Sequence, residues 1–444
     1  MRRLSVRKRS RRALGVAGIA ALTVALGLLV APAAQAALGF QGLSAQPANL
    51  AAGANSNVNI HVGFSDPSDQ VKDLTVHLPP GLTGNPTATP QCTVNQLNSD
   101  ACPANSQVGS VSAKVLVHVA VLPVDQTVNG SLYNLVPQPG EPARFGIVLR
   151  PAGGLLPKII QQSAVHLRRS DFGLDTVINN FPREASGLQT DIESLDITLF
   201  GTANGNGFMR NPTSCSTAAV SFDADSYGGN AAHGTAPPFT PTSCAALDFS
   251  PTLTATVGKA GATDAGSNTP LRTVIAQDPT EAGLKTAKVL LPNSIGPNTT
   301  LFNTPCSRLQ FEVKASGCPR KSIVGSAIAT STFLPRALGG AVVLVKPGPT
   351  DFLPRLGVSL HGPLSMNILG SFVIEAGGQG NAFMKLPDIP ISQFILRFHG
   401  GRNGLVSTST NLCNSPPPRF TTSFDGFNGA HTGGKVLATI NGCS

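Results

Sequence analysis

Short runs of apolar residues recur along the chain, some alternating with polar residues, and turn-forming residues separate them. Such runs, rich in Val, Ile, Leu and Thr, are typical of β-strands, because successive side chains of a strand point to opposite faces of the sheet. We therefore expect a mostly β protein. The expected strands lie near residues 57–64, 73–78, 108–122, 144–149 and 192–200, and then near 271–276, 285–291, 323–332, 341–345 and 356–360.

Helical signal is slight. Residues 93–97 and 308–313 each follow a cysteine, and each segment predicts one or two helical turns. Residues 177–188 predict a third short helix, although Pro182 interrupts it. These segments leave the β character of the chain unchanged.

The chain contains an internal repeat. The segment CPANSQVGS begins at Cys102 and CPRKSIVGS begins at Cys318, and six of their nine positions match. The segments that precede them, 66–81 and 278–294, are also similar, as are 190–201 and 387–400. We interpret the chain as two copies of one β domain, a first copy (37–250) and a second copy (251–444). The expected architecture is two β-sandwiches in tandem, loosely immunoglobulin-like, although the chain has no Trp.

All eight cysteines lie in the two copies, and none has the C-x₂-C spacing of a zinc or redox site. An even number in an exported chain predicts a disulfide framework. A duplicated domain should form its bridges twice in the same way, and pairing of neighbours satisfies this condition. A crossed pairing within each half is the alternative. The predicted bridges are Cys92–Cys102, Cys215–Cys244, Cys306–Cys318 and Cys413–Cys443.

Residues 1–36 have the pattern of a secretory signal peptide. Seven basic residues precede an apolar run from Ala13 to Ala31, and Ala34-Gln35-Ala36 forms a cleavage pattern that leaves Ala37 as the new N-terminus. The general secretory route is favoured over the twin-arginine route. We expect a protein that is secreted or held at the cell surface, with a membrane attachment only if this segment is retained as an uncleaved anchor.

Removal of this segment lowers the net charge of the chain. The whole chain carries a formal charge of +9, and the seven basic residues of 1–36 leave +2 for the remainder. No basic run remains there, which argues against a nucleic-acid partner. Charged residues make up only 12% of the chain, beside 47 Gly and 36 Pro, a composition that favours short strands joined by turns.

The motifs of common enzymes are absent from the sequence, including G-x-S-x-G and H-E-x-x-H. We therefore expect no catalytic residues, no cofactor and no enzymatic activity. Ser106 and Ser322 recur in the repeated C-P-x-x-S pattern, and we interpret them as serines that bond to the backbone near a bridge.

Two further pairs of residues are candidates for specific chemistry. Asp223 and Asp225 have the alternating carboxylates that Ca²⁺ favours, and a solvated Asp-rich turn is the alternative. Lys72 and Lys285 precede matching strands and are candidates for Lys–Asn crosslinks, with solvated edge lysines as the alternative. No metal is otherwise expected.

The pattern L-P-P-G-L…N-P…C-T…Q…C-P-x-x-S-x-V-G resembles a group of uncharacterised secreted proteins from actinobacteria that are built of several such modules. The matching residues are Leu78–Leu82, Asn85-Pro86, Cys92-Thr93, Gln96 and Cys102–Gly109. The second copy departs from the pattern at Asn293-Ser294, where Pro-Gly would be expected. The resemblance covers most of both copies and implies no known activity.

Three functions remain. The leading hypothesis is a non-enzymatic extracellular or cell-envelope module that acts in adhesion or as a structural spacer, with an envelope component or another extracellular protein as its partner. The second is a carrier that binds an apolar or lipid ligand between its sheets. Its basis is the apolar strands and the Leu-Pro loops at 155–157, 334–335 and 353–354. The third is a secreted hydrolase whose site the sequence does not reveal.

Overall fold

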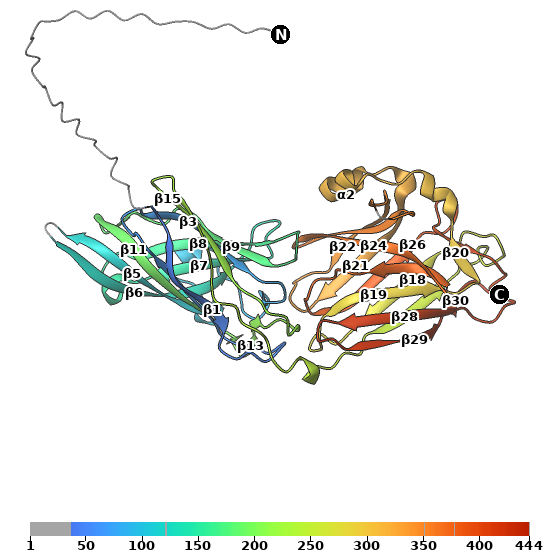
Figure 1. The fold of residues 1–444 in the computed structure, drawn as a ribbon, viewed down its shortest axis with the longest axis horizontal. Coiled ribbons are helices and arrows are strands. Elements are labelled where there is room, and N and C mark those ends of the chain that lie inside the picture. Colours follow the sequence, from blue (N-terminus) through green and yellow to red (C-terminus); the bar gives the residue numbers. More distant parts are fainter. Residues whose placement is uncertain (1–36, 120–121, 350, 377, 444) are drawn as a thin grey trace, which may run out of the picture. The chain divides into compact units, whose positions relative to one another are not determined.

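Strands dominate the computed structural model (Figure 1). The structure describes residues 37–443 apart from 120–121, 350 and 377. The expected signal peptide lies outside these residues. The part of the chain from Ala37 to Ser444 forms one compact unit. None of its described helices is long and apolar enough to cross a membrane.

The strands of the first copy form one antiparallel path. Their order is β1 (Phe40–Pro47), β2 (Val58–Phe64), β11 (Leu188–Leu199), β5 (Gln107–Val119), β6 (Leu122–Leu135), β7 (Ala143–Leu149), β8 (Ile159–Leu167), β9 (Leu174–Ile178), β3 (Val71–Leu78), β15 (Ser221–Ser226) and β16 (Ala231–Thr235). The path bends over a shared apolar interior and makes a sandwich.

The second copy repeats this order strand for strand. Its path is β17 (Thr252–Val257), β18 (Leu271–Ala276), β26 (Ile391–Phe398), β21 (Ile323–Ser331), β22 (Leu338–Val345), β23 (Arg355–His361), β24 (Ser365–Glu375), β25 (Gly378–Phe383), β19 (Leu284–Leu291), β28 (Arg419–Gly426) and β29 (His431–Leu437). A short β30 (Thr439–Ile440) joins β17 in parallel. The fold is therefore two similar, mostly β domains, as the repeat in the sequence predicts.

Matching irregularities support the duplication. A β-bulge lies between Gln107 and Gly109 in β5, and another lies between Ile323 and Gly325 in β21, at the same place in the repeated motif. A one-residue change of register would turn every following side chain to the other face, so a shared bulge keeps the same residues inward in both copies.

Short strands form three separate two-stranded sheets and one addition to the first large sheet. They are β4 (Thr83–Gly84) with β14 (Met209–Arg210), β12 (Thr202–Ala203) with β13 (Asn206–Gly207), β20 (Ile295–Pro297) with β27 (Val406–Thr408), and β10 (Glu184–Ala185) beside β11. The 3₁₀ segments are η1 (Ala104–Ser106), η2 (Pro151–Gly154), η3 (Cys244–Ala246), η4 (Thr299–Asn303), η5 (Ala315–Gly317) and η6 (Arg320–Ser322).

The two short helices lie where the sequence predicts them, as α1 (Val94–Asn98) and α2 (Arg308–Lys314). A polar side chain begins each helix. Thr93 accepts from the Gln96 backbone N–H, and Ser307 accepts from the Gln310 backbone N–H. A disulfide joins the residues before and after each helix, Cys92 to Cys102 and Cys306 to Cys318, and fixes a segment that is too short to be stable alone.

The helix predicted at residues 177–188 is wrong. Val177 and Ile178 end strand β9, which pairs with β3 and β8, and β11 begins at Leu188. Between these strands Asn180 and Ser186 have positive φ angles of 56° and 55°, which a helix excludes. Pairing on both sides of β9 overrides the weak local preference.

The structure joins the four predicted cysteine pairs. Their Cα–Cα distances are 5.2 Å for Cys92–Cys102, 5.9 Å for Cys215–Cys244, 5.2 Å for Cys306–Cys318 and 5.5 Å for Cys413–Cys443. All are within the usual range for a bridge. Four bridges indicate that the protein folds in an oxidising compartment.

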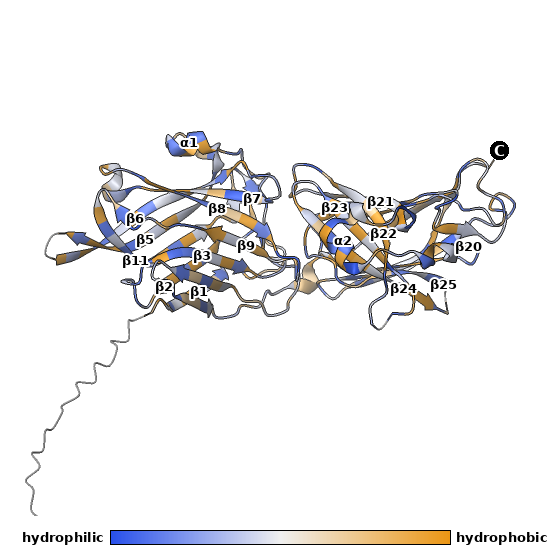
Figure 2. Ribbon diagram, turned by 90° about the horizontal axis from the view of Figure 1, so that it is seen from above, coloured by the Kyte–Doolittle hydropathy of each residue, from blue (hydrophilic) through white to orange (hydrophobic). Residues whose placement is uncertain are grey.

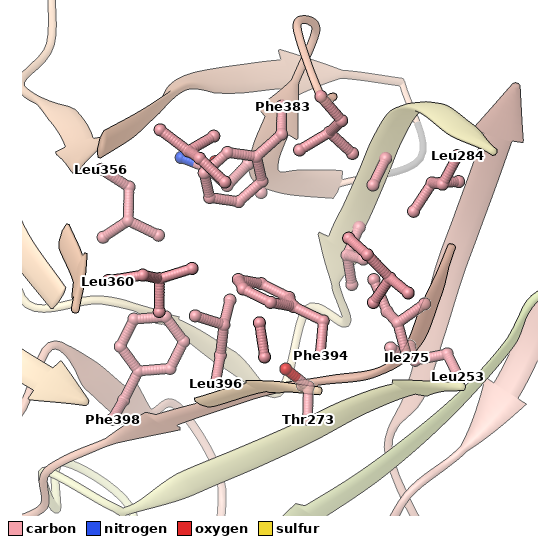
Figure 3. A pocket seen from close by; sticks show the side chains of 18 of the residues that line it. Leu253, Thr273, Ile275, Leu284, Leu356, Leu360, Phe383, Phe394, Leu396 and Phe398 are labelled. Atoms are coloured by element: carbon pink, nitrogen blue, oxygen red, sulfur yellow. The ribbon is translucent and has the colours of Figure 1, made fainter. Parts of the chain in front are cut away.

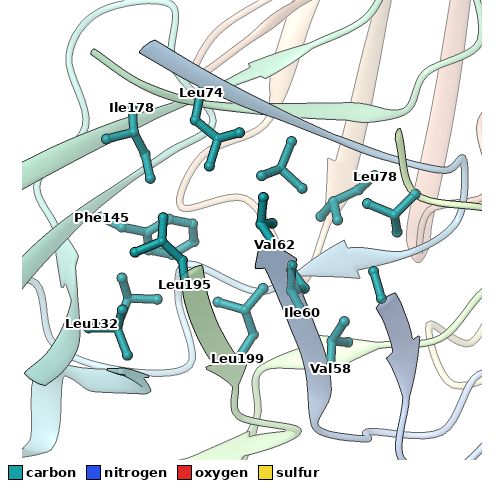
Figure 4. Packing of buried hydrophobic residues seen from close by; sticks show 14 of the residues in the cluster. Val58, Ile60, Val62, Leu74, Leu78, Leu132, Phe145, Ile178, Leu195 and Leu199 are labelled. Carbon is teal, nitrogen blue, oxygen red and sulfur yellow. The ribbon is translucent and has the colours of Figure 1, made fainter. Parts of the chain in front are cut away.

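The cores of the two copies differ. Hydrophobic and hydrophilic residues alternate along strands of both copies (Figure 2), which turns one face of each strand inward. In the first copy the inward side chains form one continuous cluster that includes Ile60, Leu74 and Leu195 (Figure 4). In the second copy they form two main clusters, one around Leu356 and Leu360 and the other around Leu253 and Phe420.

Candidate functional site: an apolar chamber in the second copy

A cavity of about 130 Å³ lies between the two main core clusters of the second copy (Figure 3). We call it the apolar chamber. Leu356 and Leu360 line it from one cluster, and Leu253 and Leu284 line it from the other. Phe394 on β26 also faces it. Among the described residues, no charged side chain lines the chamber, so its wall suits a hydrocarbon.

A difference between the copies accounts for part of this space. The repeated V-G-S motifs set a common register, and counting across paired strands from Gly109 and Gly325 brings Phe145 and Leu356 to the same position. Phe145 packs edge-on against Phe208, with 6.3 Å between ring centroids. The smaller Leu356 leaves room at that position in the second copy.

Strand β24 provides the second cause. Its residues Ser365–Gly370 pair with β23, whereas Ser371–Glu375 pair with β25, so the strand changes partners at Gly370. The matching β8 pairs with both neighbours over residues 163–165. Because the two pairings of β24 do not overlap, the two layers of the second copy can separate there.

One polar side chain stands out beside the chamber. Both amide atoms of Asn381, Oδ1 and Nδ2, are buried, and neither has a hydrogen-bond partner among the described residues. Asn381 lies on β25 opposite Phe372 and Val289. A Cβ at Gly370 would overlap Asn381 Oδ1, so glycine is needed there to admit the amide. A buried amide without a partner is costly, which marks it as a candidate ligand contact.

This site was not predicted from the sequence, although β25 contains a signal for it. Gln379, Asn381 and Phe383 alternate along β25 and line the chamber, so two polar residues occupy positions that are apolar in most inward-facing strands. The glycines of this segment favour a turn, and the segment was therefore not expected to be a strand.

A second apolar cavity, of about 90 Å³, lies where the two copies meet. We call it the junction cavity. Leu78, Phe145 and Phe208 of the first copy line it, together with Leu364 of the second. It shares a wall with the apolar chamber, made of Ser331, Leu334, Leu338, Met366 and Ile389.

The three Leu-Pro loops lie in different surroundings. Leu334 forms part of the wall shared by the two cavities. Leu155 is 89% exposed and Leu156 is 47% exposed, and neither lines these cavities. Leu353 is partly buried and also lies outside both cavities. Only one of the three loops therefore contributes to a candidate ligand site.

Polar contacts also join the copies. Asp388 accepts hydrogen bonds from the Thr213 backbone N–H at 2.7 Å and from the Thr213 hydroxyl at 2.5 Å. Arg210 donates to the carbonyl oxygens of Glu281 at 2.8 Å and Thr280 at 3.2 Å. Burial raises the pKa of Asp388 and lowers the pKa of Arg210, because both charged forms lose water.

An open polar cleft of about 710 Å³ lies beside this junction. His77, on its wall, contacts Asp175 through Nδ1 at 2.7 Å and Asp223 through Nε2 at 2.8 Å. Burial lowers the pKa of His77, but the hydrogen bonds to the two aspartates outweigh this effect and raise it overall. Ser221 is the cross-strand neighbour of His77, yet both imidazole nitrogens already face carboxylates. This arrangement does not leave a nitrogen to activate a serine.

The calcium candidates lie on a strand. Asp223 and Asp225 are exposed residues of β15, and Asp223 also contacts His233 Nδ1 at 2.6 Å. Within the described part of the chain, no group of three or more His, Cys, Asp or Glu side chains is arranged to hold a metal ion. The alternative of an Asp-rich turn is wrong for these two residues, because they pair with β3 and β16.

The repeated serines have the expected structural role. Ser106 Oγ donates to the Pro103 carbonyl at 2.6 Å, and Ser322 Oγ donates to the Pro319 carbonyl at 2.7 Å. Both serines are fully buried. The two hydroxyls hold equivalent 3₁₀ turns after Cys102 and Cys318.

The two crosslink candidates are both accessible to solvent. Lys72 Nζ lies 3.4 Å from Asp73, and Lys285 is exposed on the wall of the polar cleft. These surroundings fit solvated lysines, and the Lys–Asn crosslink remains a prediction.

Comparison with known proteins adds little. No family model matches the chain, and no curated protein matches it. Among solved structures, one is a protein of Corynebacterium diphtheriae described as a putative membrane anchored protein. It is 8% identical over 90% of each chain, with a TM-score of 0.18. A score this low carries no conclusion about fold or function.

Proposed function

We propose that the protein is a non-catalytic exported module that binds an apolar ligand in the second copy. One observation supports it most strongly, the apolar chamber between the two main core clusters of the second copy. A cavity of about 150 Å³ lined by Leu, Ile and Phe is known to stay dry and to bind small apolar molecules. The chamber has a similar size and lining.

A location outside the cytoplasm, secreted or at the cell surface, is part of this proposal. The four disulfides support it, since such bridges persist in oxidising compartments. An apolar ligand in that setting would come from the cell envelope or from the medium.

A structural spacer remains the second candidate, and the junction favours it. The contacts of Arg210 and Asp388 join the copies through buried polar groups. Such contacts resist the bending that separate domains on a flexible linker would allow. The two functions are compatible in one molecule.

The test of ligand binding uses the full exported chain. Mass spectrometry of an organic extract of the native protein should detect an apolar compound. Protein freed of this compound should gain thermal stability in buffer saturated with decane, because a ligand of the folded state raises the melting temperature. Leu356→Phe should abolish the gain by filling the chamber. The matched control is Leu309→Phe on α2, where the side chain is 73% exposed, and it should keep the gain.

Two results together would overturn the proposal. They are an extract without any apolar compound and a melting temperature that no aliphatic compound changes. A gain that persists in Leu356→Phe would place the bound molecule outside the chamber and would equally reject this site.

A further inference from the structure

The lining of the apolar chamber extends along two strands. Residues Leu284, Ala287, Val289 and Leu291 line it along the length of β19. On β24 the lining extends from Met366 to Phe372, which corresponds to about 20 Å of extended strand. A volume of about 130 Å³ spread over this length leaves a narrow channel. Its shape suits an extended chain better than a ring.

One end of the chamber is polar. Asn381 lies opposite Val289, toward the Leu291 end of β19, and Gln379 lies opposite Leu291 itself. The other end lies at Leu334 and Ile389, the wall shared with the junction cavity. Ser331 also belongs to that wall, but its hydroxyl already accepts a hydrogen bond from the Phe333 backbone N–H. The polar side chain that has no partner among the described residues therefore lies at the Asn381 end, where the polar group of an amphiphile would bind.

The chemistry of Asn381 restricts the polar group of a ligand. Its Nδ2 can donate and its Oδ1 can accept, so a group that both accepts and donates would satisfy the two atoms at once. A hydroxyl, a primary amide or an undissociated carboxyl group has this property. A carboxylate does not, and no cationic side chain lines the chamber among the described residues to neutralise it.

The end of the chamber at Leu334 leads toward the junction cavity. Only the shared wall separates the two spaces, and Leu334 belongs to this wall and is itself partly buried. A rotamer change of one such side chain would join them, so the junction cavity can accept the end of a chain that is longer than the chamber.

From these observations we infer that the ligand is a single linear aliphatic chain with an uncharged hydrogen-bonding end group held at Asn381. Fatty alcohols, fatty amides and undissociated fatty acids belong to this class. The chain extends along β19 and β24 to Leu334 and enters the junction cavity when it is long enough. This inference rests on the proposed binding of an apolar ligand in the chamber.

The test compares the binding of dodecanamide, dodecane and a compact hydrocarbon, cyclohexane, to the full chain by titration. We expect dodecanamide to bind about tenfold more tightly than dodecane, the effect of one or two buried hydrogen bonds. Cyclohexane should bind more weakly than both. Asn381→Leu should remove the preference for the amide and keep the binding of dodecane. The matched control, Asn403→Leu at an exposed turn, should leave the preference unchanged.

A second variant tests the path of the chain. Leu334→Trp should close the shared wall, so that hexanamide still binds while the affinity for hexadecanamide falls at least tenfold. An amide preference that persists in Asn381→Leu would refute the assignment of the polar end. Cyclohexane binding as tightly as dodecane would refute the linear shape. Both results would leave the proposed function standing, whereas a lack of binding by every compound would overturn both.

Discussion

Phe145 and Leu356 occupy equivalent positions on matching strands, and each faces a small residue on the next strand, Ser163 and Gly370 respectively. Phe145 packs against Phe208 beside the junction cavity, whereas Leu356 borders the apolar chamber. Two copies with the same strand order thus have different interiors.

The first prediction concerns two variants, in which each of these residues is replaced by the residue type of the other. Leu356→Phe should raise the free energy of unfolding by about 1 kcal/mol, because it fills existing space. Phe145→Leu should lower it by about 1–2 kcal/mol, because it removes atoms that pack against Phe208. Urea unfolding of each variant measures both values. A loss of more than about 2 kcal/mol in Leu356→Phe would indicate overpacking and would contradict the presence of usable space.

Much of the fold could be predicted from the sequence. Strand period, turn residues and the repeated C-P-x-x-S-x-V-G motif indicate the two copies. The predicted range 271–276 coincides with β18, since alternation reports which face of a strand is buried. The helix prediction for residues 177–188 was wrong, because the conformation of this segment depends on pairing of β9 with β3 and β8. Local sequence does not report such pairing.

The candidate site could not be predicted in the same way. The strands that line the chamber lie far apart in the sequence, and the equivalence of Phe145 and Leu356 becomes visible only when the register of both sheets is known. Asn381 lies in a Gly-rich segment that favours a turn, and its burial depends on the absence of a side chain at Gly370. Such pairwise relationships between distant residues leave no periodic pattern in the sequence.

The second prediction concerns the short bridges. Replacing Cys306 and Cys318 by alanine should lower the free energy of unfolding by about 2–3 kcal/mol, because the bridge restricts the unfolded chain over a short loop. Cys306 is fully buried. Its backbone N–H donates to the Leu344 carbonyl of β22, and its carbonyl accepts from the Lys346 N–H. Because the bridge attaches the far end of the helical segment to this fixed residue, its loss should also lower the protection of helix α2 from hydrogen exchange. Unchanged hydrogen exchange at residues 308–314 would contradict the predicted loss of protection in α2.

The third prediction concerns Asp388 at the junction. Folding raises its pKa above the ordinary value of 3.8, so the folded state is favoured most while the carboxyl group is protonated. Its contribution to stability should therefore decline as the pH rises from about 3.8 through the native pKa, and then stay constant. The variant Asp388→Asn carries an amide that cannot titrate and that keeps one acceptor oxygen for Thr213.

Urea unfolding at a series of pH values checks this prediction. Asp388→Asn should have a flatter pH profile than the wild type over the window that begins near pH 3.8. The matched control is Asp278→Asn, an exposed residue whose pKa is lowered by hydrogen bonds to Thr280, so its removal should not flatten the same decline. Parallel profiles for Asp388→Asn and the wild type would show that this carboxyl group does not titrate differently in the folded state.

The last prediction concerns His77. Burial lowers its pKa, but the hydrogen bonds to Asp175 and Asp223 raise it by more, so the imidazolium is favoured by folding. For a base whose pKa rises on folding, the stabilisation is complete below the unfolded value of 6.5 and is lost as the pH rises through the higher native value. His77→Gln should remove this loss of stability above pH 6.5. NMR titration should find a pKa for His77 above the ordinary value of 6.5. A pKa at or below 6.5 would contradict the stabilisation of the imidazolium by Asp175 and Asp223.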